Sequence, residues 1–140
     1  MDSNSRTAFL NAVAAWNAAP DDIYFTSSGS GDVVFQTYSA SDGYDGMTTY
    51  YAPYYCSNGS VQRLITAWSA LNTHYTNSSS YNNGARQSVA AHEIGHAVGL
   101  GHAGTNALMY YSTDRWFKYG IDTPQTDDDN GTYARYSTSC

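Results

Sequence analysis

One stretch constrains this chain more than any other: residues 92–109, with the sequence HEIGHAVGLGHAGTNALM. It contains three of the four histidines in the protein. His92 and His96 are four residues apart, so on a helix both side chains project from the same face. Glu93 lies beside them, where its carboxylate can act on a metal-bound water without binding the metal itself. The spacing therefore predicts a helix with two metal ligands and a general base.

The glycines after this helix predict how a third histidine reaches the metal. Gly99 and Gly101 let the helix end and the chain turn sharply, because glycine tolerates positive φ and close approach. The turn brings back His102. Three histidine nitrogens plus one water describe a catalytic zinc site, whereas structural sites have four protein ligands. A buried helix with histidines hydrogen-bonded in a core is the alternative, and it leaves the fixed offsets of the glycine and the third histidine to chance.

Length and charge narrow the classes of function. The chain has 140 residues, the size of one domain with a single core. Its formal net charge is −6 with only six lysines and arginines, which argues against nucleic acid and membranes as partners. No apolar run approaches the ~20 residues that a spanning helix needs. Met1 is followed by polar residues and not by a signal peptide, so a secreted protein would appear here without its leader.

The two cysteines, Cys56 and Cys140, predict one disulfide bond. Neither lies in a CxxC pair or next to the histidines, which disfavours a metal or redox role. Closing so long a loop adds on the order of 4 kcal/mol of stability in the chain-entropy model. Such a bridge implies an oxidising compartment, and a composition rich in Ser, Asn, Gly and Tyr agrees with it. We therefore expect a secreted, extracellular protein.

Hydrophobic spacing and turn residues predict elements around the histidines. A helix over Ser5–Ala18 is indicated by apolar residues at helical spacing and by many alanines, with Pro20 as its stop signal. Two short strands are indicated by β-branched and aromatic residues, at Ile23–Thr26 and Asp32–Thr37. The other segments are an extended stretch, a polar loop, the histidine helix and an irregular stretch: Met47–Tyr55, Asn77–Gly84, Gln87–Leu100 and Asp114–Asp122.

Two further segments leave alternatives open. Val61–Tyr75 is ambiguous, because its apolar residues have helical spacing and periodicity alone indicates a helix. A last helix begins near Thr126, a candidate cap, and the acids Asp127–Asp129 complement its positive N-terminal end. Calcium binding by this acidic run is the weaker alternative. For His74, the remaining histidine, we expect a surface or packing role.

The residues also carry a family resemblance. HEIGHAVGLGH resembles the HExxHxxGxxH motif of the metzincin zinc endopeptidases, and ALMYY around Met109 resembles their Met-turn. The matrixin branch, particularly its bacterial members, is the most similar: residues 8–16 (AFLNAVAAW) resemble its first helix, and residues 126–136 (TDDDNGTYARY) its DDxxGIxxLY closing helix. The resemblance implies a zinc-dependent endopeptidase that hydrolyses peptide bonds in extended polypeptides, with a zinc-bound water activated by Glu93.

The resemblance further implies an α+β fold, with a twisted, mostly parallel sheet packed on two long helices and a small C-terminal subdomain ending in a helix. Residues 1–140 would form one catalytic domain, with residues 1–102 above the cleft and residues 103–140 below it. It favours a strand near Ile65–Asn72 over the helix. In the family a first strand precedes the first helix, yet here the helix begins almost at Met1, so the number of strands stays open.

Several residue roles follow from the resemblance. One catalytic Zn²⁺ is implied, with His92, His96 and His102 as its ligands. Met109 would form a hydrophobic base under the histidines. Asp42 and Asp45 lie in SDGYDG, a loop similar to a matrixin calcium loop, and are candidate Ca²⁺ ligands; an Asp-Gly turn without an ion is the alternative.

Tyr111 lies where astacins and serralysins carry a tyrosine that can approach the zinc. It is a candidate catalytic residue, as an exchangeable ligand or as a hydrogen-bond donor to the oxyanion; lining the substrate pocket is the alternative. Tyr111 and Thr113 stand where matrixins have a Pro and a Tyr in the pocket wall. We expect this pocket to take a sizeable apolar or aromatic residue after the scissile bond.

Partners follow from the same resemblance. We expect a monomer that acts on polypeptide substrates, with a protein inhibitor or a pro-segment as a further candidate partner. A binding module that keeps the zinc but does no chemistry is disfavoured, because it has no need of Glu93. A hydrolase for non-peptide amides or esters is disfavoured by the third histidine and the Met-turn.

Overall fold

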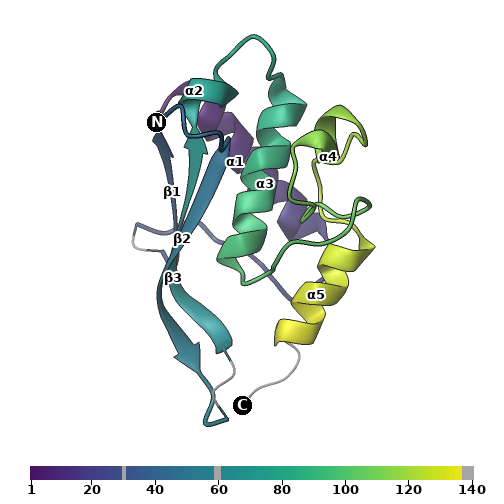
Figure 1. Cartoon of the computed structure of the whole chain (residues 1–140). Coiled ribbons are helices and arrows are strands. Elements are labelled where there is room, and N and C mark those ends of the chain that lie inside the picture. The colour runs from purple at the N-terminus through teal and green to yellow at the C-terminus, as the bar shows by residue number, and fades with distance from the viewer. Residues whose placement is uncertain (30, 59–60, 137–140) are drawn as a thin grey trace.

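The computed structural model describes residues 1–29, 31–58 and 61–136. At residues 52–54 and 61–65 it describes the backbone only. These residues form an α+β fold of five helices and a three-stranded mixed sheet (Figure 1). The elements in chain order are α1 (Ser3–Ala18), β1 (Val33–Tyr38), β2 (Gly46–Tyr55), β3 (Val61–Asn72), α2 (Thr73–Thr76), α3 (Asn83–Ala97), α4 (Asp114–Phe117) and α5 (Thr126–Tyr136).

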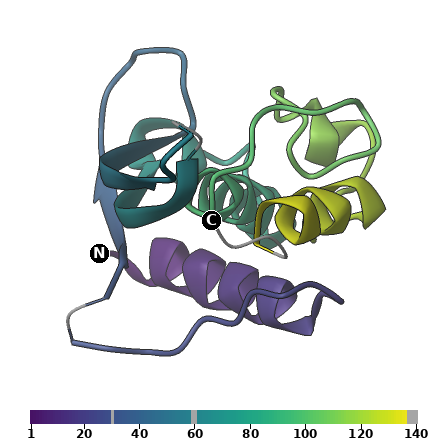
Figure 2. The ribbon, with the colours of Figure 1, turned by 90° about the horizontal axis from the view of Figure 1, so that it is seen from below.

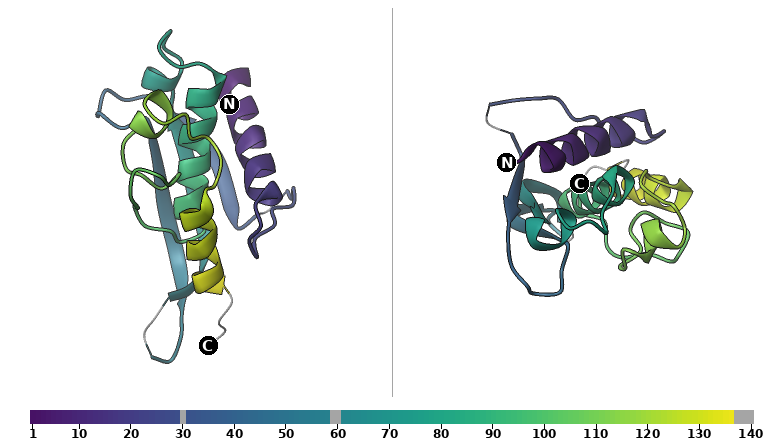
Figure 3. Two further views of the ribbon diagram at one scale, coloured as in Figure 1. Left: turned by 90° about the vertical axis from the view of Figure 1, so that its right-hand side faces the viewer. Right: turned by 90° about the horizontal axis from the view of Figure 1, so that it is seen from above.

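Helix α1 forms where the sequence predicts a helix, but it begins at Ser3 and not at Ser5. The Asp2 side chain caps it by accepting a hydrogen bond from the backbone N–H of Ser5 at 3.0 Å. Its buried face recurs every three to four residues: Ser5, Ala8, Phe9, Ala12 and Trp16. This face packs on α3, beside which α1 runs (Figure 2, Figure 3). Trp16 fixes the pair by donating from Nε1 to the carbonyl of Ala91 at 3.0 Å.

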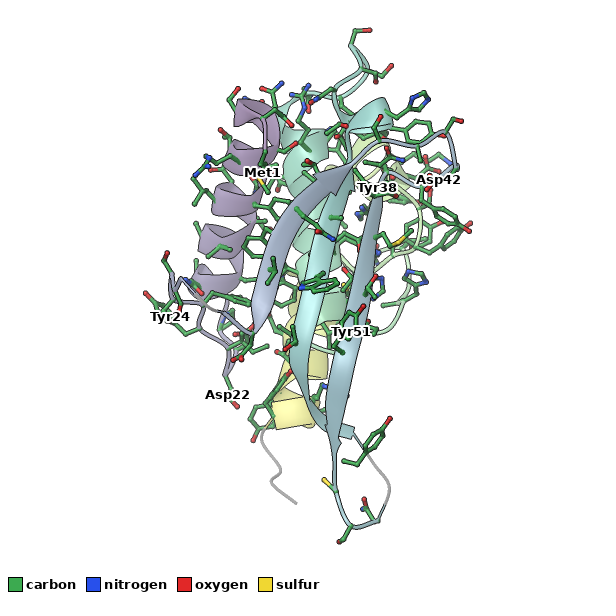
Figure 4. The ribbon with its side chains drawn as sticks, turned by 90° about the vertical axis from the view of Figure 1, so that its left-hand side faces the viewer. Met1, Asp22, Tyr24, Tyr38, Asp42 and Tyr51 are labelled. Carbon is green, nitrogen blue, oxygen red and sulfur yellow. The ribbon has the colours of Figure 1, made fainter. Side chains whose placement is uncertain are left out.

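The sheet has the strand order β1-β3-β2. β1 runs parallel to β3, with Val33 opposite Ala67, and β2 runs antiparallel to β3, with Thr49 opposite Trp68. The expectation of a mostly parallel sheet is therefore wrong for the described strands, because β2 turns directly back into β3. Helices α1 and α3 cover one face of this sheet, and Figure 4 looks onto the opposite face.

The ambiguous segment forms strand β3, and its side chains alternate across the sheet despite their helical spacing. Ser69 and Leu71 are buried against the helices, whereas Trp68, the residue before Ser69, is 37% exposed on the open face. There Trp68 packs on Tyr51 of β2, with ring centroids 4.7 Å apart. Figure 4 labels Tyr51 on this face. Such cross-strand aromatic pairs stabilise a sheet. The predicted strand near residues 65–72 is thus confirmed, and it starts earlier.

The predicted strand at Ile23–Thr26 does not form. The backbone of Phe25 pairs instead with a side chain at the end of α1: its N–H donates to Asn17 Oδ1 at 2.7 Å, and Asn17 Nδ2 donates to its carbonyl at 3.0 Å. A side-chain amide thus takes the hydrogen bonds that a neighbouring strand would have supplied. The segment stays extended and irregular.

Two further boundaries differ from those expected. Helix α3 begins inside the predicted loop, because Asn82 caps it by accepting from Ala85 N–H at 2.9 Å. The stretch expected to be irregular contains the short helix α4, whose backbone closes from Lys118 N to Asp114 O at 2.8 Å. Both helices bear on the cleft described below.

The core lies between the sheet, α1 and α3. Its largest fully buried apolar side chains come from all of these elements and from the segment after α3: Trp16, Leu71, Val89, Ile94, Leu108 and Met109. No helix among the described residues is both long and apolar enough to cross a bilayer. Cys140 lies outside the described residues, so its bridge to Cys56 stays a prediction. The division at residue 102 into an upper and a lower part also stays a prediction.

Candidate metal centre and active site

Helix α3 carries two candidate ligands, His92 and His96. It ends at Ala97, and the chain then turns so that His102 approaches them. Gly99 has φ +93°, a left-handed conformation that favours glycine. The turn is closed by the backbone N–H of Leu100, which donates to the carbonyl of Gly95 at 2.9 Å. The Leu100 carbonyl in turn accepts from His96 Nδ1 at 2.9 Å. Gly101, also expected to need positive φ, does not have it.

The three histidines converge on one point. Their ligand nitrogens all lie within 4.8 Å of one another, and no other such group of three occurs among residues 1–29, 31–58 and 61–136. Nε2 of His96 lies 3.2 Å from Nε2 of His102. Two imidazoles on one tetrahedral zinc, each with a bond of about 2.0–2.1 Å, would have nitrogens roughly 3.3–3.4 Å apart. The donor set therefore fits one zinc ion.

Hydrogen bonds fix which nitrogen of the first two histidines faces the others. His92 Nδ1 lies 2.9 Å from the carbonyl of Leu108, as His96 Nδ1 does from that of Leu100. A carbonyl only accepts, so each Nδ1 carries the proton and each Nε2 keeps its lone pair for a metal. Burial lowers the pKa of His92 well below its ordinary value, helped by nearby Arg115. Burial also lowers the pKa of His96. Both rings are therefore neutral, the form that binds metal.

Glu93 follows His92 on α3, and its side chain points toward strand β2. Its side chain is 5% exposed, and Thr48 of β2 donates to Oε2 at 2.7 Å. Burial raises the pKa of Glu93 to about 7, and the Thr48 hydrogen bond opposes that rise. Gly46 lets β2 approach this closely, since a Cβ there would lie 2.8 Å from Glu93 Cγ and Oε1. Neither Gly46 nor Thr48 was expected from the sequence, because a strand pattern does not show which residue meets a site.

Met109 is 1% exposed and packs against α3 at Gly95, the residue before His96. Its segment is held by Asp128 of α5, which accepts from the N–H groups of Leu108 at 2.7 Å and Met109 at 3.0 Å. The Met109 carbonyl accepts from Ala103 N–H at 2.9 Å. From sequence, Asp128 was assigned to the dipole of its own helix, with calcium binding as the weaker alternative; the structure gives it a long-range contact with the segment of Met109.

A cavity of about 360 Å³ opens over the histidines. Tyr111 lines it with its side chain 67% exposed and its ring centroid 6.4 Å from that of His102. The lining residues come from β2 and the loop before it, from α3 and the turn after it, and from the segment after Met109: Tyr44, Asp45, Gly46, Met47, Thr48, Tyr50, His92, Glu93, His96, His102, Tyr111 and Arg115. Arg115, in the stretch predicted to be irregular, was not expected there.

The two candidate calcium ligands are engaged with protein donors. Asp42 accepts from Asn72 Nδ2 at 3.1 Å, and Asp45 accepts from the hydroxyls of Tyr81, at 2.9 Å, and Thr113. The fully buried Asn72 also donates to two backbone carbonyls of the same loop. A side-chain amide thus occupies the centre of this loop, and calcium binding stays a prediction.

A family model for the matrixins matches residues 1–137. The match covers nearly the whole chain, so the protein belongs to the matrixin family and is a metallopeptidase. The group of three histidines is compatible with the metal that this family uses.

Proposed function

We propose that the protein is a secreted zinc endopeptidase that hydrolyses peptide bonds in extended polypeptides. One observation carries the proposal: three histidine nitrogens and the buried carboxylate of Glu93 line the same cavity. The family match supports a metallopeptidase, and the nitrogen spacing supports zinc. Secretion rests on the composition and on the predicted bridge between Cys56 and Cys140.

The three histidines, Glu93 and Thr48 would have separate tasks in this reaction. Held by His92, His96 and His102, a zinc ion would supply Lewis-acid chemistry, polarising the substrate carbonyl and making a water acidic. The Glu93 carboxylate takes the proton of the attacking water and passes it to the leaving nitrogen. Thr48 orients that carboxylate through its hydroxyl.

The substrate would bind as an added strand. β2 is an edge strand that pairs only with β3 among the described residues, and its start, residues 46–48, lines the cavity. An extended peptide can pair with such an edge through its backbone. Its scissile carbonyl would then lie over the histidines, which favours an endopeptidase that acts on unfolded or extended segments.

Tyr111 completes the proposed site as a hydrogen-bond donor to the oxyanion. Its ring packs beside that of Tyr110, with centroids 4.9 Å apart, and its exposure and its place near His102 would let the hydroxyl turn from Tyr110 toward a bound substrate. In Tyr111→Phe we expect kcat/KM to fall by roughly 10- to 100-fold, with zinc content unchanged. An unchanged kcat/KM would leave Tyr111 with a pocket-lining role only.

Zinc content and endopeptidase activity on denatured casein test the proposal, with wild type and Glu93→Ala measured side by side. We expect one zinc per chain in both proteins and cleavage by wild type alone, with a loss of roughly 10²- to 10⁴-fold or more in the variant. Zinc in both proteins with cleavage by neither would favour the alternative, a binding module that keeps the metal. Equal cleavage by both would exclude Glu93 as the general base.

A further inference from the structure

Arg115 is a buried cation in the wall of the cavity. It lies on α4 (Asp114–Phe117), its side chain is 1% exposed, and it lines the same cavity as the three histidines. Burying a guanidinium is costly unless its N–H groups find partners. The hydrogen-bond partners of Arg115 therefore indicate its role.

The guanidinium is only partly satisfied by the protein. Nε donates to Ser88 Oγ at 3.1 Å, and Nη1 donates to the carbonyl of Tyr110 at 3.3 Å. The buried Nη2 has no hydrogen-bond partner among the described residues. Among the described residues, the ion pair found is that of Lys118 with Asp114. No carboxylate of these residues therefore forms an ion pair with Arg115.

The carboxylates nearest to Arg115 have other partners. Asp45 accepts from the hydroxyls of Tyr81 and Thr113, and Glu93 accepts from Thr48. Both act on Arg115 only through longer-range attraction. The Ser88 hydroxyl and the Tyr110 carbonyl hold the guanidinium in place as acceptors, and one buried terminal nitrogen is left without a partner among the described residues.

We propose that Arg115 selects substrates with an acidic side chain, glutamate above all, at the position that enters this cavity, which we expect to be the residue after the scissile bond. A carboxylate would accept a charge-assisted hydrogen bond from Nη2 and neutralise a buried cation in one contact. Glutamate reaches farther into the cavity than aspartate. The inference rests on the proposed peptidase function, and it replaces the apolar or aromatic preference expected from the sequence.

Matched substrates test this on the wild-type zinc enzyme without any mutation. Quenched fluorescent peptides would differ only at the residue after the scissile bond, with Glu, Gln or Leu there, and mass spectrometry would verify the cleavage site. We expect kcat/KM for the Glu peptide to exceed that for the Gln and Leu peptides by roughly ten-fold or more, the effect of one charge-assisted hydrogen bond. Equal or faster cleavage of the Leu peptide overturns the inference.

Variants then assign the preference to this side chain. Arg115→Met keeps the volume and removes the charge, so the Glu-to-Gln ratio should fall to about one while the Leu peptide is still cleaved. Lys118→Met removes an exposed cation at the end of the same helix and should leave every ratio unchanged. Thermal melting shows whether each variant folds. A folded Arg115→Met that keeps its Glu preference, or a Lys118→Met that loses it, contradicts the assignment.

A binding measurement separates this inference from the proposed function. The zinc-loaded Glu93→Gln variant would be titrated calorimetrically with peptide hydroxamates, in which the hydroxamate chelates the zinc and the first side chain is Glu or Leu. Tighter binding of the Glu compound without wild-type cleavage of any peptide supports the selectivity and refutes the endopeptidase. Tighter binding of the Leu compound with normal cleavage refutes the selectivity alone. No binding of either compound and no cleavage refutes both.

Discussion

The two sides of the cavity are built on different principles. On one side, β2 lies against α3, and its backbone is held by the sheet ladder with β3. On the other side, the chain from His102 to Arg115 has little regular structure, and individual polar groups fix it. A ladder distributes its hydrogen bonds over many residues, whereas an irregular wall depends on a few buried acceptors. The irregular wall should therefore be the more sensitive side to single substitutions.

Asp128→Ala should give the largest effect, because it removes the main acceptor of the irregular wall. Three backbone N–H groups, those of Leu108, Met109 and Gln125, would lose their partner. We expect the free energy of unfolding to fall by about 3 kcal/mol or more, since buried donors without partners are costly. Urea titration measures this. Asp127→Ala, at the exposed neighbouring acid, is the control, and equal losses in both variants would show that Asp128 has no special role.

Gly95→Ala tests the contact between the irregular wall and α3. A Cβ at this position would overlap Met109 Sδ and lie 3.3 Å from Trp16 Cζ2. We expect a loss of about 1–3 kcal/mol from overpacking, together with weaker zinc binding in competition with a chelator. Gly104→Ala is the matched control, because nothing lies within 4 Å of a Cβ there. Unchanged zinc affinity in Gly95→Ala would mean that Met109 can move aside without disturbing the ligands.

Thr48→Val probes the ladder side. It removes the hydroxyl that donates to Glu93 Oε2 while the strand and its backbone hydrogen bonds remain. We expect a loss of stability of only about 1 kcal/mol and a several-fold decrease in kcat/KM, because the carboxylate loses its orientation but not its position. Thr49→Val, on the exposed side of the same strand, should change neither quantity. A stability loss as large as that of Asp128→Ala would contradict the contrast between the two sides.

Lys118→Ala, at the end of α4 just beyond the irregular wall, should have the smallest effect. Its pair with Asp114 spans 3.4 Å, but the two side chains are 66% and 43% exposed. Solvent screening makes the contribution of such an exposed pair to stability small. Chemical unfolding should therefore hardly distinguish this variant from wild type. A clear shift of the unfolding midpoint would show that exposed charges, and not only buried acceptors, stabilise this side of the cavity.

The sequence predicts one side of this contrast better than the other. Motif spacing placed the three histidines and Glu93 in one neighbourhood, because a helix and a glycine turn have fixed geometry, and the family resemblance added Met109. The packing of Thr48 on Glu93 could not be derived, since it depends on how β2 lies across a helix far away in the sequence. Arg115 was missed for a similar reason: an arginine in a polar segment normally indicates a solvated surface.

Two segments whose local pattern indicates the wrong conformation have a related explanation. Residues 23–26 have the composition of a strand, but Asn17 takes the backbone hydrogen bonds of Phe25. Residues 61–72 have the periodicity of a helix, but they pair with β1 and β2 on both sides. In both cases the partner and not the segment decides the conformation, and a single sequence does not specify partners.

Gly95 also bears on what the zinc motif means. The motif allows any residue at this position. In this chain, however, Trp16 near one end of the chain and Met109 beyond the third histidine leave no room for a side chain there. A peptide of residues 88–109 would keep every motif letter, yet its helix would meet water where the tryptophan ring belongs. The ability to capture a metal thus depends on packing between distant parts of the chain. Motif searches would discriminate better if they scored this free position jointly with the residues that pack on it.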